Sequence, residues 1–181
     1  MKNFNTGRVQ DKLINRLERQ EKQQSFQRDK FFRYKLTEMQ AALTQALLMD
    51  EIIETENPTI VSDLMLKGLK KLQKTNEFDY KYFTAPIREL VPSPNQISLY
   101  MTQYILEVVI NAPGIIEIYG TDLDIYKVVN KVIVNINQKF ERTEKKIIEQ
   151  LSHNKSLIPG SRDYDIALDQ LFNKAMGEPH E

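Results

Sequence analysis

Apolar residues recur every three to four positions through most of this chain, and that spacing limits the fold more than any other feature of the sequence. A helix completes a turn in about 3.6 residues, so this spacing places apolar side chains on one helical face. The three clearest stripes are Leu36, Met39, Leu43, Ala46 and Leu47; Val61, Leu64, Met65, Leu69 and Leu72; and Ile125, Val129, Val132, Ile136, Phe140, Ile147 and Leu151. The pattern predicts an all-α fold.

Capping residues indicate where these helices begin. Asn57 followed by Pro58 predicts a helix start, because asparagine caps the first turn and proline fits its first position. Thr121 predicts another start, and Asp124 three residues later completes an acidic variant of the capping box. The stretch 92–95, which contains two prolines, predicts a loop between the two halves of the chain.

The two halves follow the same order, which indicates an internal duplication. A shift of 63 residues places Leu36 on Leu99. The same shift places Ile52-Ile53-Glu54 on Ile115-Ile116-Glu117. Each half then consists of a helix, an Ile-Ile-Glu segment, a capped start and a second helix.

The duplication predicts a helical body over residues 36–181, with repeat one at about 36–91 and repeat two at about 96–177. Neither helical hairpin can bury its apolar face alone, so we expect the two to pack together around a pseudo-twofold axis. The two Ile-Ile-Glu segments would then lie close enough to form a short β pair.

Residues 1–35 form the remaining part of the chain, a basic arm. Residues 1–36 contain ten basic and four acidic residues, so they carry a charge of +6 and the rest of the chain carries −6. Val9, Leu13 and Leu17 recur every four residues, which predicts a helix. The next eight residues include no apolar side chain, so we expect this helix to project from the body.

Three interpretations of the arm are open. It could dock on a partner protein or on a second copy of the chain, or it could be a solvated helix face with internal ion pairs. It could also bind nucleic acid by neutralising phosphates, which we place behind the other two. The predicted partner-binding residues are Leu13, Leu17, Arg16, Arg19, Lys22, Arg28, Lys30 and Arg33.

The sequence offers little for catalysis. It has no cysteine and two histidines, which excludes a thiol nucleophile and most imidazole-based metal sites. We expect Asp122 and Asp124 to favour a helix N-terminus, and His153 to lie at a helix C-terminus. We therefore expect no catalytic residue, no metal site and no cofactor, and a protein that is not an enzyme. A hydrolase or transferase would need a pocket of buried carboxylates.

Composition and hydropathy predict a cytoplasmic protein. Apolar residues make up 41% of the chain and charged residues 28%, a balance typical of globular proteins. The formal net charge is zero, which excludes a dominant overall attraction to nucleic acid or to a membrane. Residues 1–30 lack the apolar stretch of an export signal, and no run approaches the roughly 20 apolar residues of a membrane span.

Several short motifs resemble a family of bacterial proteins. They are Phe78-Asp79-Tyr80, the stretch Tyr100 to Val109, the segment Ile115 to Thr121 with the long helix after it, and Ile158-Pro159-Gly160-Ser161 followed by Asp163-Tyr164-Asp165. Over roughly residues 39–175 the chain resembles the tandem form of the uncharacterised domain-of-unknown-function family numbered five hundred and seven. The resemblance implies a small helical cytosolic protein with no assigned activity, and it brings no site residues.

These observations together predict a non-enzymatic helical module for protein–protein interaction or assembly. Its partner would be another protein or a second copy of the chain. The alternative is a nucleic-acid- or ribosome-associated factor that binds through the basic arm. Association that is sensitive to nuclease would favour this alternative.

Overall fold

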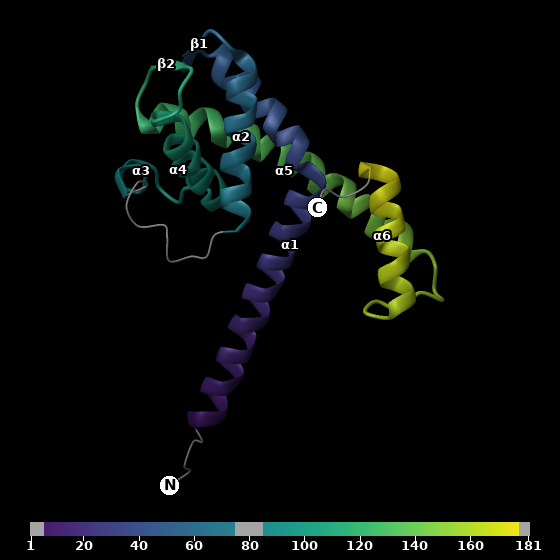
Figure 1. The fold of residues 1–181 in the computed structure, drawn as a ribbon. Coiled ribbons are helices and arrows are strands. Elements are labelled where there is room, and N and C mark those ends of the chain that lie inside the picture. The colour runs from purple at the N-terminus through teal and green to yellow at the C-terminus, as the bar shows by residue number, and fades with distance from the viewer. Residues whose placement is uncertain (1–5, 75–84, 178–181) are drawn as a thin grey trace.

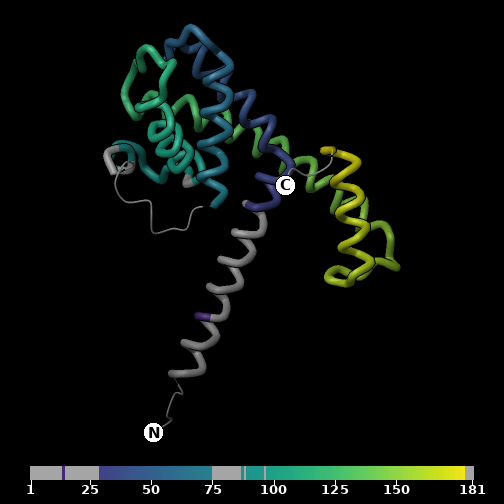
Figure 2. Tube along the Cα trace, in the orientation of Figure 1, coloured from purple at the N-terminus to yellow at the C-terminus, as the bar shows by residue number. Residues whose placement is uncertain are grey.

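The computed structural model describes residues 6–74 and 85–177 (Figure 1). Within residues 6–28 it describes the backbone and, of the side chains, that of Ile14 (Figure 2). In chain order the elements are helix α1 (Thr6–Met49), strand β1 (Ile53–Thr55), helix α2 (Pro58–Gln73), helix α3 (Ala85–Leu90), helix α4 (Gln96–Ile110), strand β2 (Ile115–Ile118), helix α5 (Asp122–Ser152) and helix α6 (Arg162–Met176). The fold is therefore all-α with one small sheet, as the apolar stripes predict.

Two long helices, α1 and α5, organise the fold (Figure 1). α1 packs along both α2 and α5, α4 packs against the same two helices, and α6 packs on α5. Figure 1 shows the N-terminal part of α1 extending away from the other helices, which confirms the predicted projecting helix. No helix within the described ranges combines the length and hydropathy needed to cross a membrane.

The predicted capping residues begin two of the helices. The Asn57 side chain accepts a 3.1 Å hydrogen bond from the backbone N–H of Thr59, and Pro58 occupies the first position of α2. At the start of α5, Thr121 and Asp124 form a capping box in which each side chain accepts the backbone N–H of the other residue. Both predicted helix starts are confirmed.

α1 ends in a turn that glycine usually provides. The N–H of Ile52 donates to the carbonyl of Leu47 (3.0 Å) and the N–H of Glu51 donates to that of Leu48 (3.2 Å), which is the Schellman pattern. Glu51 has the left-handed φ that this pattern requires, at 54°. That conformation costs a residue with a Cβ roughly 1 kcal/mol. The turn thus holds an exposed carboxylate where glycine would be less strained.

β1 and β2 pair in antiparallel fashion, which confirms the β pair expected between the two Ile-Ile-Glu segments. Ile53 lies opposite Ile118 and Glu54 lies opposite Glu117, with a bulge after Glu54. The shift of 63 residues also relates Glu54 to Glu117, so the expected pseudo-twofold axis would pass through this pair. The internal duplication itself stays a prediction.

One apolar core joins α1 to α2, α4 and α5. Met39 and Leu43 of α1 are wholly buried, as are Met65 and Leu69 of α2 and Val129 of α5. All five belong to the stripes that the three-four spacing predicts. Each such side chain contributes about 1.5–3 kcal/mol when it is fully buried, so this core fixes the C-terminal half of α1 in the body.

Five aromatic side chains fasten α1 to α5 and α6, and we call them the aromatic junction. Phe31 packs edge-on against Phe32 and against Phe140, with ring centroids 5.8 and 5.5 Å apart. Tyr34 stacks on Phe172 at 5.5 Å. All five are buried. The junction therefore joins residues far apart in the sequence at the point where α1 leaves the body.

The predicted boundary between the arm, residues 1–35, and the body, residues 36–181, lies inside α1. The helix continues through this boundary without a break. The aromatic junction also joins helix residues before the boundary to α5 and α6. The arm is therefore an extension of a core helix, so its direction is tied to that of the body.

We predict that Phe172→Ala lowers the free energy of unfolding by about 3–5 kcal/mol, because it leaves a cavity in the aromatic junction. Urea denaturation measures this loss, and hydrogen exchange should show α6 opening first. Ile166→Ala is the matched control on the same helix, since that side chain is 46% exposed, and it should change the free energy by no more than about 0.5 kcal/mol. Equal losses in the two variants would contradict the prediction.

Candidate interaction surfaces

Lys30, one of the predicted partner-binding residues, contacts other parts of the same chain. Its Nζ lies 3.7 Å from the centre of the Phe172 ring and 3.3 Å from Oε1 of Glu144. The side chain keeps 12% of its surface exposed. A cation is stabilised both by an aromatic face and by a neighbouring carboxylate. Lys30 therefore ties the base of the arm to α5 and α6.

Arg33, also a predicted partner-binding residue, is exposed. It lies near Tyr34, whose hydroxyl donates a 2.9 Å hydrogen bond to Oδ1 of Asn173. Burial raises the pKa of Tyr34 and the charge of Asp169 raises it further, while the charge of Arg33 lowers it. Arg33 thus presents a positive charge at the surface, next to the aromatic junction.

The other six predicted partner-binding residues lie on the part of α1 where the structure describes the backbone alone. They are Leu13, Leu17, Arg16, Arg19, Lys22 and Arg28. Ile14, within the same segment, has 53% of its surface exposed. A large apolar side chain that is half exposed on a projecting helix is available for contact with a partner.

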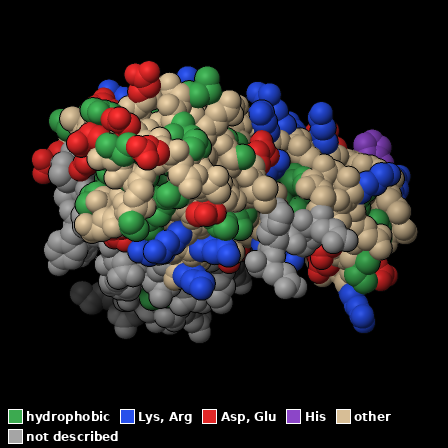
Figure 3. Space-filling model, turned by 45° about the horizontal axis from the view of Figure 1, so that its top comes forward, with side chains coloured by type: hydrophobic (Ala, Val, Ile, Leu, Met, Phe, Trp, Pro, Cys, Tyr) green, Lys and Arg blue, Asp and Glu red, His purple; other side chains and the backbone are tan. Residues whose placement is uncertain are grey.

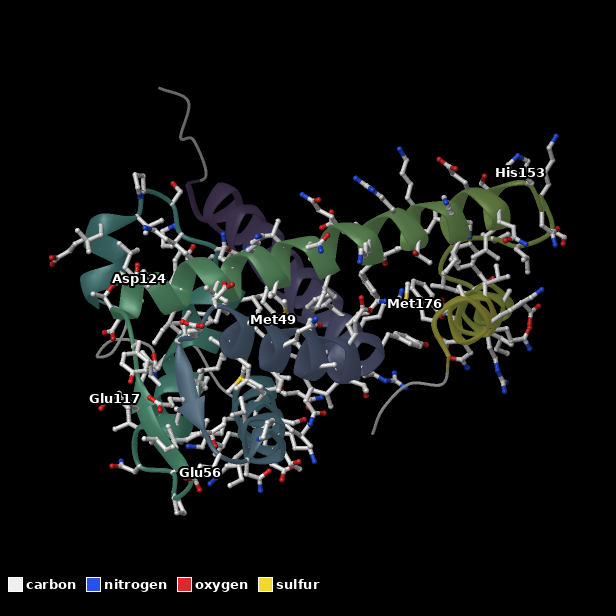
Figure 4. The ribbon with its side chains drawn as sticks, turned by 90° about the horizontal axis from the view of Figure 1, so that it is seen from above. Met49, Glu56, Glu117, Asp124, His153 and Met176 are labelled. Atoms are coloured by element: carbon white, nitrogen blue, oxygen red, sulfur yellow. The ribbon has the colours of Figure 1, made fainter. Side chains whose placement is uncertain are left out.

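The end of the body that carries the β pair is acidic, and we call it the acidic end. Residues 36–66 and residues 89–126 contain no lysine or arginine, and the pairing of β1 with β2 brings these two segments together. The exposed carboxylates at this end are those of Asp50, Glu51, Glu54, Glu56, Glu117, Asp122 and Asp124. Figure 3 shows acidic and hydrophobic side chains intermingled over this end. In Figure 4, Glu56, Glu117 and Asp124 lie at one end of the molecule and His153 lies at the other.

An open hollow lies within the acidic end, between the last turn of α1 and the sheet. Its volume is about 560 Å³, and its lining residues are Leu48, Asp50, Glu51, Ile53, Glu54 and Tyr119. Leu48, Ile53 and the Tyr119 ring supply apolar surface beside the three carboxylates. Met49, whose neighbours in sequence line the hollow, is 71% exposed. Such a surface suits an apolar side chain flanked by basic ones.

The carboxylates of the acidic end repel one another. Glu54 and Glu117 lie directly opposite across the strands, an arrangement that is destabilising when both are charged. The Tyr119 hydroxyl donates a 2.6 Å hydrogen bond to Oε2 of Glu54. That bond and the charge of Glu54 raise the pKa of Tyr119, which keeps its hydroxyl a neutral donor. Because this donor is neutral, it does not cancel the charge of Glu54. A cationic group bound here would reduce the remaining repulsion between the carboxylates.

Asp124 and His153 occupy the helix-end positions that the sequence predicts. Asp124 accepts hydrogen bonds from the backbone and the hydroxyl of Thr121, and these bonds lower its pKa. His153 follows the last turn of α5, with Nδ1 2.6 Å from the carbonyl oxygen of Glu149. Among the residues whose positions are described, no three carboxylates or histidines are grouped so that they could hold a metal ion.

A basic face lies on the C-terminal half of α2. It surrounds a hollow of about 410 Å³, whose lining residues are Asp63, Leu66, Lys67, Lys70, Lys71 and Lys74. Nζ of Lys71 lies 3.5 Å from Oε2 of Glu107 on α4, and the other three lysines are exposed. The negative end of a helix dipole favours lysines at this position. Four lysines on one helical face can also neutralise phosphates.

Neither the acidic end nor the lysine face of α2 was among the sites predicted from sequence. The two segments without lysine or arginine were readable from the sequence, but only strand pairing shows that they meet. The lysine spacing at positions 67, 70, 71 and 74 was also readable, because those positions fall on one side of a helix. Both features are hidden when charge is summed over the arm and over the whole body, because the acidic end and the lysine face then fall into the same total.

Residues 93–178 match the family model described as Protein of unknown function (DUF507). The match covers α4, β2, α5 and α6, and over this region it confirms the resemblance predicted from the sequence motifs. A second copy of the domain in the first half of the chain, and thus the tandem form, stays a prediction. No curated protein and no solved structure matches the chain.

We predict that Lys30→Met and Arg33→Met have different effects on stability. Lys30→Met should lower the free energy of unfolding by about 1–2 kcal/mol, because it leaves Glu144 without its cation and removes the charge over the Phe172 ring. Arg33→Met should change it by no more than about 0.5 kcal/mol, since Arg33 is exposed. Thermal denaturation of both variants checks this, and equal effects would contradict the role given to Lys30.

We also predict that Glu54→Gln lowers the pKa of Tyr119 toward the ordinary value for tyrosine. The substitution removes the negative charge that disfavours the tyrosinate. NMR titration of the tyrosine ring carbons measures the change. Glu56→Gln is the control in the same acidic end and should leave the pKa of Tyr119 nearly unchanged, because the hydrogen bond to Glu54, the charge of Glu54, burial and then the charge of Glu117 are what raise it.

Proposed function

We propose that this chain, whose residues 93–178 form a DUF507-like domain, is a non-enzymatic helical module that binds a protein partner through its N-terminal arm. The partner is another protein or a second copy of the chain. The observation that carries this proposal is the attachment of the arm. It leaves the body as a continuous extension of a core helix, and buried aromatic packing at its base fixes it.

A fixed arm favours binding because less conformational freedom is lost when a partner docks. Ordering a flexible segment on binding costs free energy that reduces the affinity. Here Lys30 and the aromatic junction already hold the base of the helix against α5 and α6. In the sequence of this helix two leucines lie four apart, Leu13 and Leu17, and the side chain of Ile14 between them is half exposed. This is the spacing by which an amphipathic helix contacts a partner.

The alternative function is binding of nucleic acid, as a ribosome-associated or similar factor. The predicted basic residues of the arm would neutralise phosphates, although Lys30 is already paired with Glu144. The lysine face of α2 favours this alternative from outside the arm. The described residues that line the lysine face include no aromatic ring on which single-stranded bases could stack, so we place this function second.

We predict that Leu13→Asp with Leu17→Asp in the full chain abolishes partner binding, because two charges interrupt the apolar stripe of the arm. The matched control is Ile158→Asp with Ile166→Asp, two exposed apolar positions near α6. The measurement is affinity capture from native-host lysate, with and without nuclease. A third variant, Arg16→Ser with Arg19→Ser and Lys22→Ser, removes basic charge and keeps the apolar stripe.

Partners that resist nuclease and are lost only in the leucine variant would support protein docking. Partners that are lost with nuclease or in the basic variant would support binding of nucleic acid. If the leucine variant captures the same partners as the control, the proposed role of the arm is wrong. Circular dichroism of each variant confirms that the helices are intact.

A further inference from the structure

We propose that the hollow of the acidic end binds the basic arm of a second copy of this chain. The inference rests on the proposed function, because it names the partner and the surface that receives the arm. Leu13 or Leu17 would enter the hollow, and the basic residues next to them in the sequence, Lys12, Arg16 and Arg19, would face the surrounding carboxylates.

The surface of the hollow combines the two features that an amphipathic basic helix needs. Leu48, Ile53 and the Tyr119 ring provide apolar contact, and Asp50, Glu51 and Glu54 stand with them around the same space. The arm has the complementary pattern, with leucines at positions 13 and 17 and basic residues at 12, 16 and 19. Apolar contact supplies affinity, while opposite charges select the partner and speed association.

The acidic end has few basic residues nearby in the sequence. The segments 36–66 and 89–126 contain eleven acidic residues, seven of them at the acidic end, and no lysine or arginine. Lys127 follows directly, and its charge also lowers the pKa of Asp124. Glu54 and Glu117 face each other across the strands, and the partner that the structure gives to Glu54 is the neutral hydroxyl of Tyr119. A basic helix placed here would turn this repulsion into attraction.

The geometry of α1 assigns the arm to another copy. The arm and the acidic end lie at opposite ends of one continuous helix of 44 residues. At about 1.5 Å per residue such a helix is roughly 66 Å long. The arm therefore cannot reach the acidic end of its own chain while α1 is intact. In a second copy that lies antiparallel to the first, each arm reaches the acidic end of the other.

This arrangement closes with twofold symmetry, since the same two surfaces are used on both copies. The charges of the two parts are also of opposite sign, because residues 1–36 carry +6 and the rest of the chain, which includes the acidic end, carries −6. A formal net charge of zero gives the two chains no overall repulsion to overcome. We therefore expect a dimer that dissociates as the salt concentration rises.

The test is a charge exchange between the two surfaces, in full chains. One variant makes the arm acidic, Arg16→Glu with Arg19→Glu, and the other makes the acidic end basic, Glu54→Lys with Glu117→Lys. The control, Glu149→Lys with Asp165→Lys, reverses two exposed acids on α5 and α6. Sedimentation velocity at low salt gives the dissociation constant of the dimer for each protein, and circular dichroism checks its folding.

We expect the wild-type chain and the control to dimerise alike, and each charge variant to weaken dimerisation roughly tenfold or more. Mixing the two variants should restore a one-to-one dimer, because the acidic arm of one variant then meets the basic end of the other, and the unchanged basic arm meets the unchanged acidic end. The proposal is overturned if the wild-type chain stays monomeric at about 100 μM, or if reversal of Glu54 and Glu117 has no more effect than the control.

These outcomes are distinguishable from failure of the proposed function. If the wild-type chain is monomeric but Leu13→Asp with Leu17→Asp still abolishes capture of a protein partner, the proposed function stands and the self-association fails. If the variants and the control all dimerise alike and the leucine variant also captures the same partners as its control, both proposals fail. Restored dimerisation in the mixture supports both.

Discussion

The packing of Phe31 and Tyr34 against Phe140 and Phe172 is the interaction on which the rest of this structure depends. It joins the start of the chain to its last helix and sets the direction in which the arm leaves the body. Dispersion and apolar burial provide most of its strength. Lys30 adds a positive charge that is stabilised by the Phe172 ring and by Glu144 of the same chain. The contact therefore sets the orientation of the arm relative to α5 and α6.

Local signals in the sequence predicted most of the helices correctly. Asn57, Thr121 and Asp124 cap helices with their own side chains, and such contacts span only a few residues. The β pair was also expected, because the same Ile-Ile-Glu triplet occurs in both halves. Its register places Glu54 opposite Glu117. Local chemistry therefore accounts for the starts of α2 and α5, and the repeated triplet accounts for the pairing of the strands.

Surfaces were harder to predict, because they depend on which segments meet. Lys30 and Arg33 look equivalent in the sequence, yet the return of α6 toward α1 buries one and leaves the other exposed. The hollow of the acidic end requires the last turn of α1 to lie beside β1 and beside Tyr119, which follows β2. Glu51 adds a left-handed turn at a residue other than glycine. None of these features follows from periodicity alone.

The unbroken course of α1 also makes the chain sensitive to changes in its length. Each residue of a helix turns the next by about 100° and advances it by about 1.5 Å. Deletion of a single residue between the arm and the aromatic junction would therefore rotate the apolar stripe of the arm by about 100° relative to the body. A change of seven residues would bring the stripe back to within about 20°. In this region the number of residues therefore sets the angle at which the apolar stripe of the arm faces, relative to the rest of the fold.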